Sequence, residues 1–278
     1  MRMPFSFTIK KYLALFLELT GINSIMFNNL NRSFSNNYIR IINYHSVPTD
    51  SSAQFEKQIR WLKQHFEFCT KEKLVQFLSG DAAFHEKPGV LLTFDDGFLD
   101  NYSVAYPIMK QFGVKAMFMI STELVGKKNA GTQNMDYMTA DQILQLSRDG
   151  NEVCSHTATH HRMSALDDSE TLQFEIIQSK QWLEKLLQHP VDIFCWVGGE
   201  EETYTAEASH MIREHYQYGM MTNSCPVTPG TDPFQLDRSN IESSWPVSLL
   251  KFQIAGSIDR KLAPKRDRIH HLTGRENS

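Results

Sequence analysis

Residues 90–97 read V-L-L-T-F-D-D-G, and this stretch decides the fold that we expect. Its apolar and β-branched residues suit a buried parallel strand, which runs directly into two carboxylates and a glycine. Open α/β folds carry their chemistry at such carboxyl ends of strands. Neighbouring residues on an extended chain point in opposite directions, so one of Asp95 and Asp96 can face a metal and the other a reacting water. An Asx turn that only closes the strand explains the Asp-Gly pair equally well.

A histidine cluster ends a second short strand about sixty residues downstream, where residues 151–166 read N-E-V-C-S-H-T-A-T-H-H-R-M-S-A-L. His156 and His160 are four residues apart, so on a helical turn they share one face and can hold one metal ion. Adding one carboxylate gives a facial triad with open positions, which suits Zn²⁺ or another divalent ion that activates water. A lone histidine pair is more often a surface or core feature. Two strand-end clusters with complementary ligand types favour the metal site.

Together the two clusters carry a family resemblance. T-F-D-D-G at residues 93–97 and H-T-A-T-H at residues 156–160 resemble the first two motifs of the NodB-homology polysaccharide deacetylases. These are metal-dependent carbohydrate esterases (family four), and the resemblance implies an α/β fold, a distorted (β/α) barrel of about seven parallel strands. It also implies Asp95 as the general base. The implied ligands of a divalent metal, Zn²⁺ with Co²⁺ or Ni²⁺ as alternatives, are Asp96, His156 and His160.

The resemblance covers about residues 38–258, and two family motifs within or beyond this span are altered. The third motif usually places an Arg or an aromatic residue with Pro-Tyr-Gly after a strand, but residues 194–199 read F-C-W-V-G-G. The late leucine-x-histidine motif supplies the family's general acid. It has no counterpart here, because the late histidines His270 and His271 lie in a basic tail. Protonation of the leaving amine is therefore left without a residue.

Three further side chains are candidates for substrate binding, each with a structural alternative. His45 follows a predicted strand at residues 38–44 and either lines the pocket or is a hydrogen-bonded structural histidine. Trp196, in the place of the third motif, can stack on a sugar ring or belong to the core. Arg238, in Q-L-D-R-S-N-I, can supply the missing cation or form a surface salt bridge.

Composition and periodicity indicate one globular domain. The chain has 278 residues, 41% of them hydrophobic, and a single α/β barrel commonly uses about 250. From residue 38 onward strand patterns alternate with helix patterns, which predicts a parallel sheet. Helices are expected at residues 53–65, 71–78, 99–112, 139–148, 166–188 and 206–216, and a polar loop at 121–138 is expected over the site. The net charge of −4 and dispersed basic residues give no face for nucleic acid.

The two ends of the chain are expected to differ from the barrel at residues 38–258. Residues 1–37 form an N-terminal amphipathic helical segment, whose helix at residues 9–30 either packs on the barrel or lies against a membrane surface. Glu18 interrupts its apolar run, and a charge in mid-span costs about 2.5–3.5 kcal/mol. Residues 259–278 are a basic tail without apolar periodicity, typical of a solvated segment or of an electrostatic contact with anionic lipid. Truncation after Ser257 is therefore expected to spare activity on a soluble substrate.

The family resemblance implies a metal-dependent hydrolase that removes an N-acetyl group from a sugar of a cell-envelope polysaccharide or of its lipid-linked precursor. The alternative is a catalytically impaired deacetylase-like protein that binds glycan or serves in an assembly complex. The missing acid favours this alternative, whereas retention of Asp95 favours an enzyme. The four cysteines form no close pair in the sequence, which favours reduced thiols and a cytoplasmic chain. A peripheral position at the inner membrane face is the alternative location. The glycan and the oligomeric state are left open.

Overall fold

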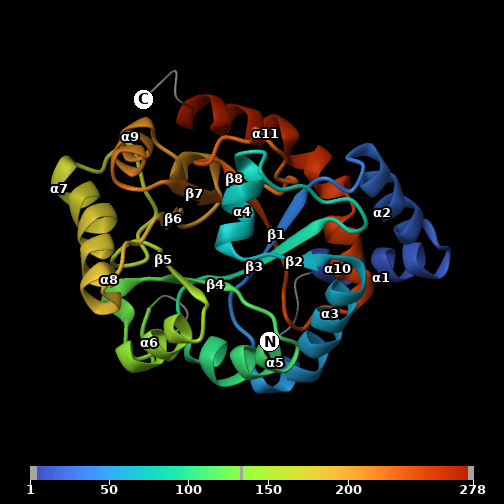
Figure 1. Cartoon of the computed structure of the whole chain (residues 1–278), viewed down its shortest axis with the longest axis horizontal. Coiled ribbons are helices and arrows are strands. Elements are labelled where there is room, and N and C mark those ends of the chain that lie inside the picture. Colours follow the sequence, from blue (N-terminus) through green and yellow to red (C-terminus); the bar gives the residue numbers. More distant parts are fainter. Residues whose placement is uncertain (1–4, 132–133, 275–278) are drawn as a thin grey trace.

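A closed barrel of parallel strands forms the centre of the computed structural model, which describes residues 5–131 and 134–274 (Figure 1). The strands are β1 (Ile39–Tyr44), β2 (Glu67–Phe68), β3 (Gly89–Phe94), β4 (Met117–Ile120), β5 (Glu152–Ser155), β6 (Ile193–Cys195), β7 (Tyr218–Met221) and β8 (Leu236–Asn240). Among the described residues their order is β1-β8-β7-β6-β5-β4-β3-β2, and a parallel β1–β3 pairing closes a ring of seven, with the short β2 outside it. The predicted barrel is confirmed.

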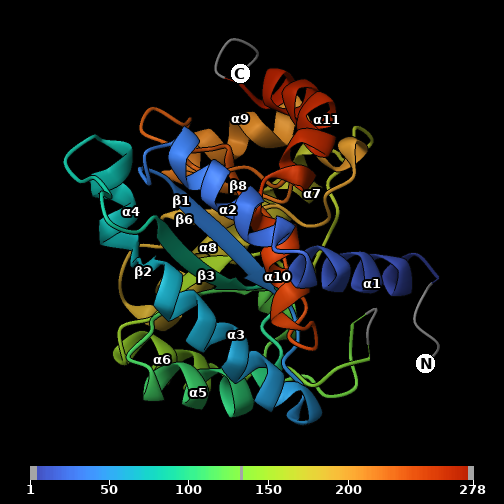
Figure 2. The same ribbon diagram turned by 90° about the vertical axis from the view of Figure 1, so that its right-hand side faces the viewer.

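Helices surround the barrel and connect its strands (Figures 1 and 2). The α-helices are α1 (Phe5–Leu19), α2 (Ile22–Ser33), α3 (Ser52–His65), α4 (Lys71–Leu78), α5 (Tyr106–Gln111), α6 (Ala140–Arg148), α7 (Ser169–Leu172), α8 (Ser179–Leu187), α9 (Ala206–His215), α10 (Val247–Ile254) and α11 (Ser257–Thr273). Two π-helical segments, Asn101–Ala105 and Gln173–Gln178, lead into α5 and α8. The helices predicted at residues 99–112 and 166–188 are therefore present with π-helical interruptions.

Alternation along the strands divides the core into two layers. Ile39 and Ile41 of β1 belong to the cluster inside the barrel, whereas Ile42 belongs to the larger cluster under the surrounding helices. Phe77 of α4 and Phe84 join the inner cluster and close the end of the barrel at which the strands begin. Polar side chains are consequently left to the opposite end, where the strands finish.

The polar loop at residues 121–138 packs against the D-D-G turn. Backbone hydrogen bonds run in both directions between the turn and the described residues of the loop. The N–H of Met138 donates to Gly97 O over 2.9 Å, and the N–H of Leu99 donates to Asp136 O over 2.8 Å. The loop thus flanks the carboxyl end of β3. None of its described residues lines the cavity that contains Asp95 and Asp96, so the loop lies beside this cavity, whereas it was expected over the site.

The N-terminal segment contains two helices where one was expected. Gly21, with φ of 75°, separates α1 from α2. Both helices pack on α10: Asn23 Nδ2 donates to Ser248 O over 3.1 Å, and Glu18 of α1 pairs with Lys251 of α10. One side of this segment therefore packs on the barrel domain, which was one of the two alternatives.

The C-terminal segment is not a solvated tail, and that expectation was wrong. Residues 257–273 form α11, which buries Ile269 completely and places Asp259 against the buried Arg40 of β1, with Nη2 and Oδ2 2.8 Å apart. Near the end of α11, the Thr273 carbonyl accepts hydrogen bonds from Ser209 and Arg213 of α9. The helix was not predicted because its many basic residues suggested a solvated segment. The residues that pair with them are distant along the chain. The folded barrel domain therefore continues well past residue 258.

Candidate metal and catalytic site

The turn after β3 directs two neighbouring carboxylates to different partners. Asp96 and Gly97 have φ of 72° and 77°, so the chain leaves the extended conformation directly after Asp95. A Cβ on Gly97 would also come 3.1 Å from Cδ1 of Ile120, so this left-handed position favours glycine. Asp95 contacts Arg238, whereas Asp96 contacts the histidines. The turn therefore directs Asp95 toward Arg238 and Asp96 toward the histidines. The alternation of side chains along a strand, which was the expected cause, does not explain it.

Asp96, His156 and His160 form a compact triad. The Oδ1 atom of Asp96 lies 3.4 Å from Nε2 of His156 and 2.9 Å from Nε2 of His160. One ligand atom from each side chain lies within 4.8 Å of the others. Asp96 and His156 are buried, and His160 is half-buried. The structure therefore brings together the three residues proposed as metal ligands.

A non-helical loop, not the expected helical turn, brings the two histidines together. His156 directly follows β5, and both Thr157 and His160 have left-handed φ, of 65° and 64°. The buried carboxylate of Glu175 holds this loop, because it accepts hydrogen bonds from the N–H groups of Ala158 and Thr159, each over 2.9 Å. Glu175 was not singled out in the sequence, where it belongs to an ordinary helix pattern.

The donor set fits a divalent transition metal. Two imidazoles and one carboxylate with open positions are a common Zn²⁺ environment. His156 Nδ1 lies 3.0 Å from the carbonyl oxygen of Cys195, a contact that fixes the ring and leaves Nε2 for a metal. Burial opposes ionisation of Asp96, yet hydrogen bonds and charge from His156 and His160 outweigh it and hold the pKa of Asp96 well below its usual range. An anionic ligand is therefore preformed.

His160→Ala is expected to reduce bound Zn²⁺ from about one ion per chain to near zero, because one of three ligands is lost. Elemental analysis after loading and dialysis measures this, and circular dichroism reports on the fold. His161→Ala is the matched control, since His161 Nε2 contacts Asp167 Oδ2 at 2.9 Å and does not belong to the triad. Undiminished metal in the His160 variant would show that the triad does not hold the ion.

Asp95 is locked in a buried ion pair with Arg238. Nη1 and Nη2 of Arg238 lie 2.6 and 2.9 Å from the two carboxylate oxygens, and Asn43 Nδ2 donates to Oδ2 over 2.8 Å. Burial alone would raise the pKa of Asp95, but the charge of Arg238 and its hydrogen bonds prevail and lower it to about 2. Arg238 is 1% exposed, which rules out the surface salt bridge considered as its alternative. Arg238 is not among the described residues that line the pocket, so its predicted contact with substrate is not borne out; it is the buried partner of Asp95 instead.

The structure supports a place in the pocket for His45 but not for Trp196. His45 lines the pocket, with Nε2 3.8 Å from Oδ2 of Asp95, so the structure places it at the site as predicted. Trp196 is 2% exposed and packs against Phe194 and Tyr204. Its proposed stacking on a sugar is therefore a wrong prediction. The physical reason is strand parity, because Cys195 faces the barrel interior and its neighbour Trp196 faces the layer under the helices.

The catalytic pocket is a cavity of about 400 Å³. Of its further walls, sequence reasoning had considered only Glu200, as one of three glutamates in a turn that could reach the site. Besides the predicted residues it is lined by Arg162, Gly198, Gly199, Glu200, Thr222, Asn240, Leu262 and Lys265. Lys265 of α11 donates a hydrogen bond to the carbonyl of Gly199, and Thr222 Oγ1 donates to the carbonyl of Gly198 over 2.7 Å. These contacts fix the glycine turn that stands in place of the third motif. They come from segments with no shared local pattern, so the sequence offered no signal for them.

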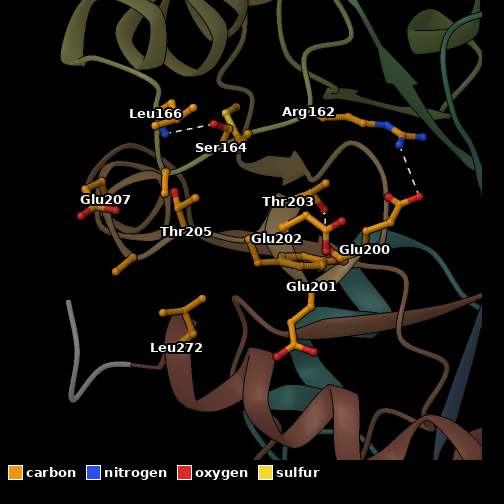
Figure 3. Close-up of a pocket in the computed structure, with 14 residues that line it drawn as sticks. Arg162, Ser164, Leu166, Glu200, Glu201, Glu202, Thr203, Thr205, Glu207 and Leu272 are labelled. Carbon is orange, nitrogen blue, oxygen red and sulfur yellow. Dashed lines mark hydrogen bonds and ion pairs between the residues drawn. The ribbon is translucent and has the colours of Figure 1, made fainter.

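A second, wider cavity of about 980 Å³ adjoins this pocket and shares two of its lining residues, Arg162 and Glu200. Figure 3 shows Arg162 directed toward the Glu200 carboxylate, at 3.3 Å, and Leu272 of α11 facing the loop that carries the neighbouring glutamates. The pocket and the cavity therefore form adjoining hollows along one face, with the Arg162–Glu200 pair common to both.

Comparison with known proteins agrees with this geometry. A family model described as polysaccharide deacetylase matches residues 83–215. The poly-β-1,6-N-acetyl-D-glucosamine N-deacetylase of Staphylococcus aureus (strain MRSA252) is 30% identical over 222 residues, which cover 74% of this chain and 73% of that protein.

Two solved structures share the fold. IcaB from Ammonifex degensii has a TM-score of 0.68 at 21% identity, covering 80% of this chain and 97% of its own. The Streptococcus pyogenes deacetylase PplD, solved with acetate, has a TM-score of 0.64 at 23% identity and covers 78% and 98%. Fold, motifs and relatives agree, and the chain belongs to the polysaccharide deacetylases, a family of hydrolases.

Proposed function

We propose that this protein removes N-acetyl groups from a polymer of β-1,6-linked N-acetylglucosamine, with a divalent metal at the triad. The observation that carries the proposal is the position of Asp95. This carboxylate is buried and ionised and is not needed in the triad, yet it lies within 4.8 Å of His156. The Staphylococcus aureus relative is a poly-β-1,6-N-acetyl-D-glucosamine N-deacetylase, which supports the choice of glycan.

Asp95 is the base of the proposed reaction. Asp96, His156 and His160 would hold a divalent cation, which would supply a Lewis acid for the amide carbonyl and lower the pKa of the attacking water. Asp95 accepts the proton of that water, and Arg238 with Asn43 holds the carboxylate in one orientation for this transfer. The pKa of Asp95, lowered to about 2, keeps it ionised at neutral pH but also makes it a weak base. The pair with Arg238 therefore serves orientation more than basicity.

His45 is the residue we assign to protonation of the leaving amine. Among the described residues that line the pocket, the other two imidazoles belong to the triad. The half-exposed ring of His45 stands on the pocket wall beside Asp95, and its backbone carbonyl accepts a 2.6 Å hydrogen bond from Asn101. When the tetrahedral intermediate collapses, the imidazolium gives its proton to the sugar nitrogen as the carbon–nitrogen bond breaks. Arg238 and His45 thus occupy the two roles whose family motifs are altered.

Acetate release from purified β-1,6-linked N-acetylglucosamine oligomers tests the proposed function. The Zn²⁺-loaded protein is expected to release acetate from these oligomers faster than from N-acetylglucosamine itself or from chitin oligomers. A lipid-linked N-acetylated saccharide, the other substrate considered from the sequence, forms a further arm of the assay. Failure to release acetate from every N-acetylated glycan by metal-loaded, folded protein would contradict the proposal.

His45→Gln is expected to lower kcat on these oligomers by about 10²–10⁴-fold, the usual contribution of a general acid. Metal content should stay unchanged, because His45 is not a ligand. His161→Gln makes the same chemical change outside the pocket and should leave kcat within a few-fold of the original. Wild-type turnover in His45→Gln would mean that another group protonates the amine.

A further inference from the structure

The large apolar side chains that remain exposed are concentrated at the N-terminal end of the described chain. Seven of the ten such residues fall between residues 12 and 25. Five of them are on α1: Tyr12, Leu13, Leu15, Phe16 and Leu19. Ile22 and Ile25 of α2 continue the patch. Figure 2 shows α1 projecting away from the barrel. We call these seven side chains the N-terminal apolar patch.

The patch has the periodicity of a surface that is normally buried. Its α1 members are spaced i, i+1, i+3, i+4 and i+7, the pattern of an apolar stripe along one side of a helix. The other side of α1 is already in contact with the protein, because Ala14 is buried and Glu18 pairs with Lys251 and accepts from Asn23. Leu19, at 79% exposure, and Phe16, at 58%, are therefore directed outward by the way α1 is fixed to α10.

The sequence of α1 favours an anionic lipid surface as the partner of the patch. The chain as a whole carries a net charge of −4, but the sequence of residues 1–20 contains three basic residues and one acidic residue. That acidic residue, Glu18, is paired with Lys251 and adds no free negative charge. Aromatic and leucine side chains beside basic residues are the composition of helices that lie in the membrane interface. No helix among the described residues is long and apolar enough to cross a bilayer.

We propose that the N-terminal apolar patch inserts into the interface of an anionic lipid bilayer. In Figure 2, α1 projects on the side of the barrel toward which β1 and β3 run, the side that carries the catalytic pocket. A bilayer bound there faces the open end of the barrel. This inference stands on exposure and charge and does not depend on the proposed function.

Co-sedimentation of the full chain with vesicles tests this proposal. The protein is expected to bind vesicles of phosphatidylcholine mixed with phosphatidylglycerol and to bind phosphatidylcholine alone more weakly. Added salt should lower binding to the mixed vesicles because it screens the attraction. Leu19→Glu is expected to weaken the partition coefficient at least about tenfold, since a leucine leaves the interface and a charge enters.

Leu166→Glu is the matched control, because Leu166 is 94% exposed on a loop far along the chain and receives the same change. It should bind vesicles like the unchanged protein. Phe16→Glu provides a second test within the patch, and melting curves show that each variant is folded. Equal binding by folded Leu19→Glu, or no binding by the unchanged protein, overturns the proposal. So does sedimentation equilibrium in which Leu19→Glu converts a dimer to a monomer, because a second copy would then cover the patch.

Discussion

Asp95→Asn is expected to lower acetate release by about 10²–10⁴-fold while the triad still binds metal. The amide cannot accept the proton of the attacking water, whereas Asp96, His156 and His160 are unchanged. Turnover is measured as acetate released per metal-loaded chain. Residual activity close to that of the unchanged protein would place the base elsewhere.

The same substitution also leaves Arg238 as a buried cation without its anionic partner. Removing one member of a buried ion pair typically costs about 3–5 kcal/mol, so the variant should be assayed well below its melting temperature. Asp100→Asn is the matched control. Asp100 is half-buried and bonded to Ser46, close to the site, but it does not line the pocket. Its turnover should stay within a few-fold, which separates loss of the base from a general loss of negative charge.

The barrel was predictable because its signals are local. The run of apolar residues before Asp95 and the alternation of strand and helix patterns follow from periodicities of a few residues, and β3 is present at Gly89–Phe94. The meeting of the two clusters was predictable because each follows a strand, and the ends of parallel strands meet. The choice of Asp96 and not Asp95 as the third member of the triad came from the family resemblance. The Asp-Gly pair indicated a turn, but not that the left-handed conformation begins at Asp96 itself, because most aspartates in turns have negative φ.

Contacts between distant segments were beyond the reach of pattern reasoning. Arg238 is 143 residues from Asp95, and only closure of the barrel makes them partners. Likewise, α11 looked like a solvated segment because the partners of its charged residues lie far along the chain: Asp259 contacts Arg40, and Lys265 donates to the carbonyl of Gly199. From sequence alone, a basic segment is therefore interpreted as a solvated tail, because its partners are known only from the fold.

Asp259→Ala is expected to lower the free energy of unfolding by about 3–5 kcal/mol, because it strands the fully buried guanidinium of Arg40. Both guanidinium Nη atoms of Arg40 donate to Asp259, over 3.0 and 2.8 Å, and Ser224 Oγ donates to the same carboxylate over 2.8 Å. Urea denaturation followed by circular dichroism measures the change.

A second ion pair of α11 serves as the control. Arg268 donates two hydrogen bonds to Glu201, but both side chains are exposed to solvent. Arg268→Ala should therefore lower the free energy of unfolding far less than Asp259→Ala does, because solvent screens an exposed pair. If the two substitutions cost the same, burial of the Arg40–Asp259 pair is not what fixes α11.

Truncation after Ser257 combines these losses, and its expected outcome is now the reverse of the sequence-based one. The deletion removes Asp259 from Arg40, Ile269 from the core and Lys265 from the catalytic pocket. The truncated chain should either fail to fold or lose acetate release on a soluble oligomer, even though His45 and the triad lie outside the deleted segment. A folded, fully active truncated chain would show that α11 is dispensable. Loss of activity in a folded chain, with metal retained, would instead assign α11 to the substrate-binding wall.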